Sequence, residues 1–566
     1  MNGKVMQLFL MLFLALALLF CACDTDEGDT DSDNAASDDD NAPTDDDSAP
    51  TDDDAGADDD DSGDDDDDDT GPCTEGARGC VGTQTTVCLD GVLVPFADCH
   101  DDGWGCEEGH CAATGDETPA QAEYRTRLDQ LRCENFLEPM ELDRFGGWMN
   151  APASLGELEP GDYFRVEKID GKWWFITPDG NLFVSKGVTD VNWLGATLSD
   201  DKWHDIIEEK YGTEDVWADA ALARLYDWNF NTVGPWSSYS MSLLSSHAIV
   251  ILDSAGHAPR YPDAMVTDFW STGFAEWSVT TAEQRAAPYV EDQNLIGYFL
   301  DNELVWGPDH FATNKTLLWL YMEFPADAPG REVAIDFVQD AAGTIEVFNQ
   351  MWGTNIADWD ELETLPPTTY WPRNETAQAV SDAFQILAFH QYATTAISGL
   401  RTVDANHLIL GCRFHTYPGD AMVRAAVEHF EVISIAFYWE TPPVHEIDGI
   451  YDEVDIPFLI EEWSFKAMDA GLLNIQNYAP VVATQKARSL AYDDYVETYM
   501  RRPYAIGYHW YKWMDNPWRG ISDIFSGDNF GLMDPRDEPY EPFVAFVREV
   551  NCRVEIWHDQ GSEAAR

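Results

Sequence analysis

The chain has few basic residues: 32 Lys and Arg stand against 105 Asp and Glu among 566 residues, and the formal net charge is −73. Such an acidic surface repels nucleic-acid backbones and anionic lipid, which excludes binding to either as a main function. The segment Asp24–Thr70 has no Lys, Arg, aromatic or branched apolar residue and contains 24 Asp. It cannot bury enough apolar surface to fold, so we expect a disordered acidic linker over residues 23–72.

Long apolar runs are also scarce, and the run Val5–Phe20 near the N-terminus is too short to be read as a membrane span. Lys4 precedes it and small residues follow it, as in a secretion signal over residues 1–22. Leu-Phe-Cys-Ala-Cys resembles a bacterial lipobox, which implies cleavage before Cys23 and acylation of that cysteine. We therefore expect an exported chain held by lipid at a bacterial membrane or cell surface, the outer membrane being favoured. Secretion without lipid is the alternative.

Cysteine is concentrated in one short region, where six of the 11 cysteines lie within 39 residues. An even, dense set in an exported chain indicates a small module stapled by disulfides, over residues 73–113. Zinc binding is the alternative, but the spacings lack paired short Cys-x2-Cys knuckles. The connectivity cannot be read from the sequence. The six are Cys73, Cys80, Cys88, Cys99, Cys106 and Cys111.

After a connecting segment over residues 114–144, the composition becomes that of a packed domain. Short apolar runs alternate with amphipathic helical patterns for about 400 residues, which is typical of an α/β barrel. We expect a (β/α)8 TIM barrel over residues 145–556. Its eight strands are predicted at Leu182–Val188, Asn229–Pro235, Ala248–Leu252, Leu295–Leu300, His407–Gly411, Val432–Phe437, Ile456–Ile460 and Ala505–Tyr508.

Two of these apolar runs end in carboxylates. The predicted fourth strand is followed by Asn302 and Glu303, and the seventh by Glu461 and Glu462. In barrel enzymes the C-terminal ends of the strands carry the chemistry. Two strand-end glutamates suit a retaining glycosidase, with one as acid/base and the other as nucleophile. The plainer alternative is that each glutamate only ends a strand and meets water.

Eight sequence blocks, in order over about residues 145–550, resemble glycoside hydrolase family 50, the β-agarases. The resemblance implies a clan A barrel and a retaining mechanism with Glu303 as acid/base and Glu462 as nucleophile. It also implies cleavage of β-galactosidic bonds in agarose or a related galactan. The blocks include Gly297-Tyr-Phe-Leu-Asp-Asn-Glu-Leu, Leu410-Gly-Cys-Arg-Phe, Pro457-Phe-Leu-Ile-Glu-Glu-Trp-Ser-Phe and Gly507-Tyr-His-Trp-Tyr-Lys-Trp-Met-Asp-Asn-Pro.

Several residues near the strand ends are candidate substrate contacts. The resemblance implies that Asn302 bonds the sugar 2-hydroxyl, and Tyr438 could donate its hydroxyl to the nucleophile. His415 and His509 are candidates for hydrogen bonds to sugar hydroxyls, and structural histidines are the alternative. Aromatic faces bind the apolar C–H faces of sugars, although core packing accounts for part of any such set. The aromatic candidates are Trp236, Trp306, Trp463, Trp510 and Trp513.

Two departures from the family pattern leave the substrate open. Family members often have glycine where this chain has Glu461, and alternation along the strand puts Glu461 and Glu462 on opposite faces. Ser526-Gly-Asp-Asn-Phe-Gly also departs from the family's Asp-Gly-Glu-Asn form, in a loop that can shape sugar subsites. Exo or endo cutting and the oligomeric state cannot be read from the sequence.

Two other functions compete with the agarase hypothesis. One is a β-galactosidase-like enzyme acting on another β-linked glycan, and the other is an inactive, lipid-anchored carbohydrate-binding protein. Intact Glu303 and Glu462 disfavour the inactive protein. In each case the expected partner is a polysaccharide. No metal-ligand cluster or phosphate loop stands out in the sequence, so we expect no metal and no cofactor.

Three cysteines remain outside the module and the signal region. Cys133 precedes the first predicted strand and Cys552 follows the last helix, and the two ends of a domain often lie close together. We predict a Cys133–Cys552 disulfide with Cα atoms less than about 7 Å apart. Cys412 follows an apolar strand, so we expect it to be free and buried.

Overall fold

The computed structural model describes residues 119–135, 139–194, 201–242, 246–250, 266–308, 315–364, 374–474, 478–517 and 527–561, with five short strands between residues 78 and 112. The predicted signal peptide, Cys23, the acidic linker and the six clustered cysteine side chains lie outside the described residues. The five strands form two antiparallel sheets. These are β1 (Arg78–Val81), β2 (Gln84–Leu89) and β3 (Val92–Asp98), and β4 (Gly105–Glu107) with β5 (His110–Ala112).

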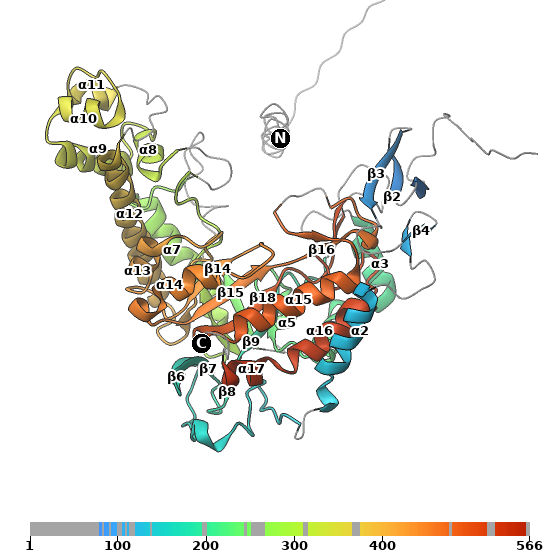
Figure 1. The fold of residues 1–566 in the computed structure, drawn as a ribbon. Coiled ribbons are helices and arrows are strands. Elements are labelled where there is room, and N and C mark those ends of the chain that lie inside the picture. Colours follow the sequence, from blue (N-terminus) through green and yellow to red (C-terminus); the bar gives the residue numbers. More distant parts are fainter. Residues whose placement is uncertain are drawn as a thin grey trace, which may run out of the picture. The chain divides into compact units, whose positions relative to one another are not determined.

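The centre of the following domain is an eight-stranded sheet in which every neighbouring pair is parallel (Figure 1). Each strand overlaps one of the eight strands predicted from the apolar runs. The mixed α/β class is therefore confirmed. In hydrogen-bonded order they are β13 (Leu408–Ile409), β12 (Leu295–Phe299), β11 (Ser246–Val250), β10 (Thr232–Val233), β9 (Ser185–Val188), β18 (Ala505–Trp510), β15 (Phe458–Trp463) and β14 (Ile433–Ala436).

The two strands at the ends of this order also meet, because the chain that continues from β13 pairs with β14. Phe414 forms a parallel bridge with Ile435. The backbone N–H of Phe414 donates to the carbonyl of Ser434 at 3.0 Å, and that of Ala436 donates to the carbonyl of Phe414 at 2.7 Å. The segment that follows β13, the first strand in the order, is thus hydrogen-bonded to β14, the last strand in the order.

Helices follow most of the strands, as the alternating sequence pattern predicted. Many begin at a polar cap: the Thr213, Ser271 and Thr484 side chains each accept a hydrogen bond from a backbone N–H of the first turn. Five helices, α8 to α12, lie between β12 and β13. The helices are α2 (Pro119–Leu131), α3 (Asp201–Tyr211), α4 (Glu214–Asp227), α5 (Tyr239–Ser242), α7 (Thr272–Arg285), α8 (Leu317–Met322), α9 (Pro329–Ala342), α10 (Ile345–Trp352), α11 (Trp359–Thr364), α12 (Glu375–Arg401), α13 (Asp420–Ala426), α14 (Val444–Val454), α15 (Gln485–Met500), α16 (Glu541–Asn551) and α17 (Val554–Gln560).

Four short 3-10 helices and a few small strands complete the described elements. The strands β6, β7 and β8 form an antiparallel meander directly before β9. The small strands are β6 (Arg165–Ile169), β7 (Lys172–Ile176), β8 (Leu182–Phe183), β16 (Lys466–Ala467), β17 (Val481–Val482), β19 (Asn516–Pro517) and β20 (Gly527–Asp528). The 3-10 helices are Cys133–Asn135, Ala153–Leu155, Ala287–Tyr289 and Met468–Ala470.

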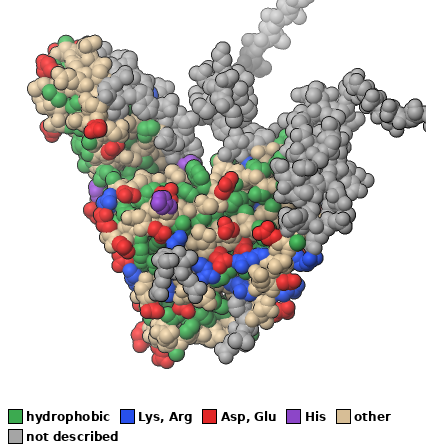
Figure 2. Space-filling view, viewed as in Figure 1, with side chains coloured by type: hydrophobic (Ala, Val, Ile, Leu, Met, Phe, Trp, Pro, Cys, Tyr) green, Lys and Arg blue, Asp and Glu red, His purple; other side chains and the backbone are tan. Residues whose placement is uncertain are grey.

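The apolar core has two main parts. The larger packs the strands against the helices. The smaller joins residues near the starts of the strands, such as Ile296, Leu459 and Ile506, to Phe175 and Phe183 of the meander. The meander packs against the starts of the strands. It therefore does not cover the polar side chains at their carboxyl ends, which are available to form a site. Figure 2 shows Asp and Glu spread over the face in view, in keeping with the acidic composition.

The two cysteine predictions that fall on described residues are confirmed. Cys133 and Cys552 form a disulfide with Cα atoms 6.1 Å apart, and Cys412 is free and buried. Among the residues that the structure describes, no helix has the length and apolar character required to cross a membrane.

Candidate active site

The polar side chains at the carboxyl ends of three strands converge on one cluster. Glu303 follows β12, Arg413 follows β13, and Glu461 and Glu462 lie in β15. The backbone N–H of Glu303 donates to the carbonyl of Arg413 at 3.0 Å. Glu303 and Arg413 have φ values of 46° and 53°, a region that non-glycine residues seldom adopt. Such backbone strain concentrates at functional sites, where the surrounding structure holds it in place.

Arg413 is the centre of this cluster and is fully buried. Its Nε donates to Oδ1 of Asn302 at 2.6 Å. Its Nη1 lies 2.7 Å from Oε2 of Glu461, and its Nη2 donates to Oε1 of Glu462. The planar guanidinium fork thus connects the ends of β12 and β15, which fixes the relative positions of groups from distant parts of the chain.

Glu462 has a donor on each oxygen. Besides Arg413, the hydroxyl of Tyr438 donates to its Oε2 at 2.9 Å. The structure therefore contains the Tyr438 contact that was predicted from the sequence. Two directed donors, one of them charged, stabilise the negative charge of this carboxylate and hold it in a single orientation.

Glu303 lies in a different environment. Its burial raises the pKa to about 8, the negative charge of Glu462 adds to that shift, and Arg413 opposes it. A glutamic acid with such a pKa keeps its proton near neutral pH and can act as a general acid. The two strand-end glutamates thus differ in the way that acid and nucleophile must differ.

The expected alternation of Glu461 and Glu462 is interrupted by a bulge. In the pairing of β14 with β15, Ile435 faces Ile460 but Ala436 faces Glu462, so Glu461 is an extra residue on its strand. A bulge re-aims the side chains beside it, which explains why both carboxylates reach Arg413. Simple alternation was therefore the wrong expectation at this point of the strand.

Two other predicted contacts lie beside the cluster. Trp236 has a φ of 67° and its ring centroid lies 6.0 Å from the Arg413 guanidinium carbon. His415 lines a pocket of about 190 Å³ together with Trp306 and Tyr417. Burial lowers the pKa of His415, and the charge of Glu462 opposes that shift, which shows that this pocket is electrostatically coupled to the cluster.

Four other predicted sugar contacts belong to the core, which corrects their assignment. Trp463, Trp510 and Trp513 are at most 1% exposed. Trp463 stacks on Tyr495 with ring centroids 4.2 Å apart, and Trp510 donates its indole N–H to the carbonyl of Phe530 at 3.0 Å. The fourth is His509 on β18, which is also fully buried.

His509 is held as a structural residue, the alternative that the sequence left open. Its Nε2 is hydrogen-bonded to Oγ of Ser185 at 2.8 Å. A Cβ at Gly187 would lie 2.3 Å from the imidazole ring, so only glycine fits there. Burial, followed by the charge of Arg413, lowers the pKa of His509 to about 3. The ring is therefore neutral over the usual pH range.

Sequence reasoning missed Arg413 and an aromatic wall beside Glu462. Arg413 lies inside one of the recognised blocks, but a lone arginine after a strand gave no further signal. Tyr438 packs against Tyr478 and Tyr511, with ring centroids 5.2 Å and 6.0 Å apart, and Tyr478 stacks on Phe530. Burial raises the pKa of Tyr478, and the charges of neighbouring groups, Glu462 among them, add to the shift. This wall therefore borders the carboxylates.

One group of side chains in the described part of the chain has the spacing of metal ligands. There, the one group of side chains close enough to share an ion is Cys133, Glu549 and Cys552, and its two cysteines form the disulfide.

Curated relatives are β-agarases, although no family model matches the chain. β-Agarase B of Vibrio sp. (strain JT0107) is 23% identical over 484 residues, which cover 72% of this chain and 50% of that protein. β-Agarase A of the same strain is 25% identical over 466 residues, which cover 69% and 46%. The chain thus spans about half the length of the curated relatives it matches.

Solved structures show the same fold. A structure of an exo-β-agarase has a TM-score of 0.64 at 20% identity and covers 81% of this chain and 72% of that chain. The agarase AgWH50C has a TM-score of 0.62 at 21% identity, with 81% and 73% covered. The resemblance drawn from the eight sequence blocks is confirmed, and the chain is β-agarase-like, similar in sequence and fold to proteins of glycoside hydrolase family 50.

Proposed function

We propose that the chain is a retaining glycoside hydrolase that cleaves β-galactosidic bonds in agarose or a related galactan. One observation carries the proposal: two strand-end glutamates share one cluster but lie in different electrostatic and hydrogen-bonding environments. Glu303 has a pKa raised to about 8, whereas Glu462 receives hydrogen bonds from Arg413 and Tyr438 on its two oxygens. Environments that separate two carboxyl groups in this way assign one as acid and the other as nucleophile.

In the first step, a carboxylate oxygen of Glu462 attacks the anomeric carbon, and the bond from that carbon to the leaving oxygen breaks. Glu303 gives its proton to the leaving oxygen, which departs as a hydroxyl group. Asn302 is placed beside this reaction because its Oδ1 is held by Arg413, which directs its amide nitrogen as the donor to the sugar 2-hydroxyl. The product is a glycosyl-enzyme ester on Glu462.

In the second step, water attacks the anomeric carbon, and the ester bond from that carbon to Glu462 breaks, which releases the sugar and restores the Glu462 carboxylate. Glu303 takes the proton of the attacking water. The cause of the raised pKa explains this change of role. Part of it is the negative charge of Glu462, which is lost when the ester forms. The pKa of Glu303 therefore falls in the intermediate, so the residue that served as acid can then serve as base. We predict a separation of about 5–6 Å between the two carboxyl groups, the distance of retaining enzymes.

The proposal includes a closed (β/α)8 barrel over residues 145–556. The order of eight parallel strands and the bridge between Phe414 and Ile435 support closure, because they leave neither end of the order without a neighbour. Active sites of such barrels lie at the carboxyl ends of the strands, where the cluster around Arg413 is found.

The proposal for the N-terminal part follows from the sequence. A signal peptide over residues 1–22, a lipid on Cys23, an acidic spacer over residues 23–72 and a disulfide-rich module over residues 73–113 would hold the enzyme at a cell surface. Metabolic labelling with a fatty acid tests this arrangement, and a Cys23→Ser variant that keeps the label would contradict it.

The central test is sugar release from a panel of agarose, porphyran and simple β-galactosides. Activity on agarose by the wild type and its loss in Glu462→Gln would support the proposal. Cleavage of other β-linked glycans alone would instead support the β-galactosidase-like alternative. Binding without turnover by the wild type would point to a carbohydrate-binding protein.

A further inference from the structure

We infer that the pocket beside Glu303 is the subsite of the leaving sugar, the sugar unit that carries the oxygen to which Glu303 gives its proton. This inference rests on the proposed glycosidase function and deepens it by naming where the leaving side of the substrate binds. The pocket residues that carry the argument are Trp306, Gly307, Gln385, Phe414, His415 and Tyr417.

The pocket is built largely by the continuations of two strands that meet at the catalytic cluster. Trp306 follows Glu303 in the segment after β12, and Phe414 and His415 directly follow Arg413 after β13. The backbone N–H of Glu303 donates to the carbonyl of Arg413 at 3.0 Å, which ties the two segments together. The walls of the pocket are therefore fixed to the residues that carry the proposed chemistry.

The pocket lies on the acid side of the cluster. Its described lining residues come from the segments after β12 and β13 and from α12, and none of them comes from β14, β15 or β18 or from the segments that directly follow these strands. Those strands and the segments after them carry Glu462, Tyr438 and Tyr511. Because the acid protonates the leaving oxygen, the leaving sugar extends from the bond on the side of Glu303.

The size and the lining of the pocket suit one sugar unit. Its volume of about 190 Å³ is below the roughly 300–1,000 Å³ of pockets that enclose drug-sized ligands. Trp306, Phe414 and Tyr417 supply aromatic rings, which bind the apolar C–H faces of sugars. Gln385 and His415 supply an amide and an imidazole, groups that form hydrogen bonds with hydroxyls.

The long helix α12 completes the pocket and holds its shape. Gln385 of this helix lines the pocket, and Phe389 and Tyr392 lie further along the same helix. Both rings pack against Trp306, with ring centroids 5.4 Å and 5.5 Å away. Trp306 is thereby fixed before any ligand binds, which lowers the entropic cost of binding. The helical segment between β12 and β13 thus contributes to substrate binding.

Gly307 offers a way to fill the pocket while leaving the fold intact. Among the described residues, a Cβ at Gly307 would have one heavy atom within 4 Å, Nε2 of Gln385 at 3.9 Å, an ordinary van der Waals distance. Gly307→Leu therefore places a side chain in the pocket. The matched control is Gly449→Leu on α14, where a Cβ would also meet open space. Thermal unfolding shows whether each variant is folded.

Binding is measured in the Glu462→Gln background by calorimetry with an agarose hexasaccharide. The ¹⁵N imidazole resonances of His415, assigned with His415→Gln, report on the pocket itself. The sugar should shift these resonances, Gly307→Leu should remove the shift and weaken binding by about tenfold, and Gly449→Leu should bind like its parent. Gln385→Ala adds no bulk and should also weaken binding, so the test does not depend on one variant.

Kinetics then show which side of the bond the pocket serves. Gly307→Leu should lower kcat/KM on the hexasaccharide by about 10–100-fold. The loss should be far smaller on the β-fluoride of the agarose-repeat disaccharide, because its leaving group is a single atom. Equal losses on both substrates would overturn the leaving-side assignment, and unchanged binding would overturn the subsite. A wild type that binds sugar through the pocket without turnover would overturn only the glycosidase proposal.

Discussion

Two buried ionic networks in the same domain are built on opposite principles. At the carboxyl ends of the strands, Arg413 faces the three carboxyl groups of Glu303, Glu461 and Glu462. Between β9 and the helices α16 and α17, Lys186 faces a single carboxylate, Glu555, at 2.5 Å. The first network has three carboxyl groups for one base, whereas the second has one carboxyl group for one base.

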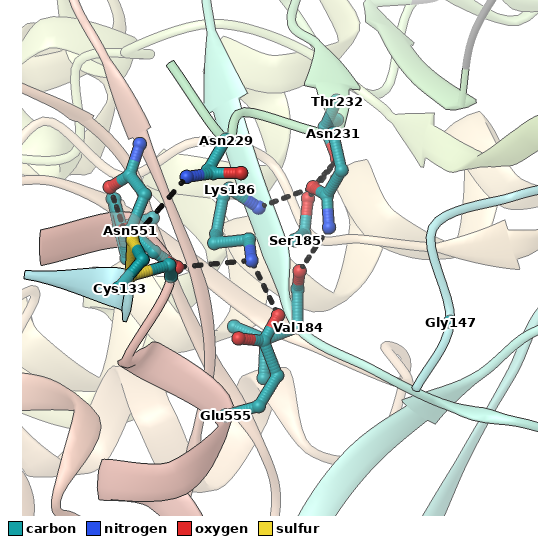
Figure 3. A network of polar contacts seen from close by, with 12 residues as sticks. Cys133, Gly147, Val184, Ser185, Lys186, Asn229, Asn231, Thr232, Asn551 and Glu555 are labelled. Atoms are coloured by element: carbon teal, nitrogen blue, oxygen red, sulfur yellow. Dashed lines mark hydrogen bonds and ion pairs between the residues drawn. A yellow bond between two sulfur atoms is a disulfide. The ribbon is translucent and has the colours of Figure 1, made fainter. Parts of the chain in front are cut away.

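The balanced network, shown in Figure 3, satisfies most of its polar groups, with Oε2 of Glu555 as an exception. Lys186 donates to Glu555 and to the carbonyl of Asn551. The side chain of Asn231 accepts from the backbone N–H of Lys186 at 2.8 Å and donates to the carbonyl of Val184 at 2.9 Å. Asn551 itself accepts from two tyrosine hydroxyls and donates to a carbonyl. These hydrogen bonds fix the packing of α16 and α17 on β9.

This contrast distinguishes a structural ion pair from a cluster that has the character of an active site. A network that pairs each charge with one opposite charge stabilises one arrangement of the surrounding elements. An excess of buried carboxylates shifts protonation equilibria and costs stability, which is the signature of a functional site. Substitutions in each network should therefore have different effects on activity and stability.

Replacing the nucleophile should have the largest effect. Glu462→Gln removes the attacking oxygen, so turnover should fall by about four orders of magnitude, or about 5.5 kcal/mol. Initial rates on agarose oligosaccharides measure this, with the circular dichroism spectrum as the control for folding. Activity within tenfold of the wild type would show that another residue forms the ester.

Replacing the acid should affect substrates unequally. Glu303→Ala should slow cleavage of agarose oligosaccharides by about 10²–10⁴-fold, because the leaving oxygen needs a proton. Activated aryl glycosides should still form the glycosyl-enzyme, and azide should then restore turnover. Equal losses on both substrates, with no azide effect, would count against Glu303 as the acid/base.

Glu303 also predicts a pH dependence with a definite sign. Its pKa in the folded state, about 8, lies above the unfolded value, so the protonated form is favoured by folding. Activity that needs the acid, and the stability this group contributes, should both be lost as pH rises through about 8. Glu303→Gln should remove that part of the alkaline loss in unfolding temperature, and an unchanged alkaline loss would assign it to other groups.

Breaking the balanced network should affect stability alone. Lys186→Met leaves Glu555 buried without its base, which should cost about 3–5 kcal/mol of unfolding free energy. The double variant Lys186→Met with Glu555→Leu should regain most of that loss, because it buries no lone charge. Urea unfolding gives the stabilities, and kcat per folded molecule should stay at the wild-type value. A changed pH–rate profile would join this network to the active site.

Removing the disulfide should also destabilise without altering the chemistry. Cys133 and Cys552 are 419 residues apart in sequence. Closing so long a loop is worth about 6 kcal/mol as an upper limit in the chain-entropy model, and disulfides typically contribute about 2–4 kcal/mol. The double variant Cys133→Ser with Cys552→Ser should therefore unfold at a lower temperature. Its kcat at a permissive temperature should equal that of the wild type, and Cys412→Ser serves as a control for the loss of a sulfur.

The smallest effect is expected at Tyr438. Tyr438→Phe removes one hydrogen bond to the Glu462 carboxylate, which is worth about 1.5–3 kcal/mol. The carboxylate then loses a donor that orients it, so kcat/KM on agarose oligosaccharides should fall by about 10–100-fold. Unchanged kinetics would show that Arg413 alone is sufficient to hold the nucleophile.

The eight strands and the two strand-end glutamates, Glu303 and Glu462, could be predicted from the sequence alone. Buried strands have short apolar runs, and the polar residue that ends each run is visible without coordinates. The pairing of Cys133 with Cys552 followed from counting cysteines and from the closeness of domain ends. The strands and the strand-end glutamates depend on local patterns, so they could be predicted one segment at a time, whereas the disulfide needed the general rule that domain ends lie close together.

Which side chains are in contact with one another depends on the tertiary structure. Trp463, Trp510 and His509 lie near strand ends as the sequence suggested, yet the helices and the sheet interior bury them. The bulge at Glu461 and the role of Arg413 depend on pairing between β13, β14 and β15, which are far apart in the sequence. Whether a strand-end side chain meets a sugar or packs into the core depends on such long-range neighbours, which local residue patterns do not encode.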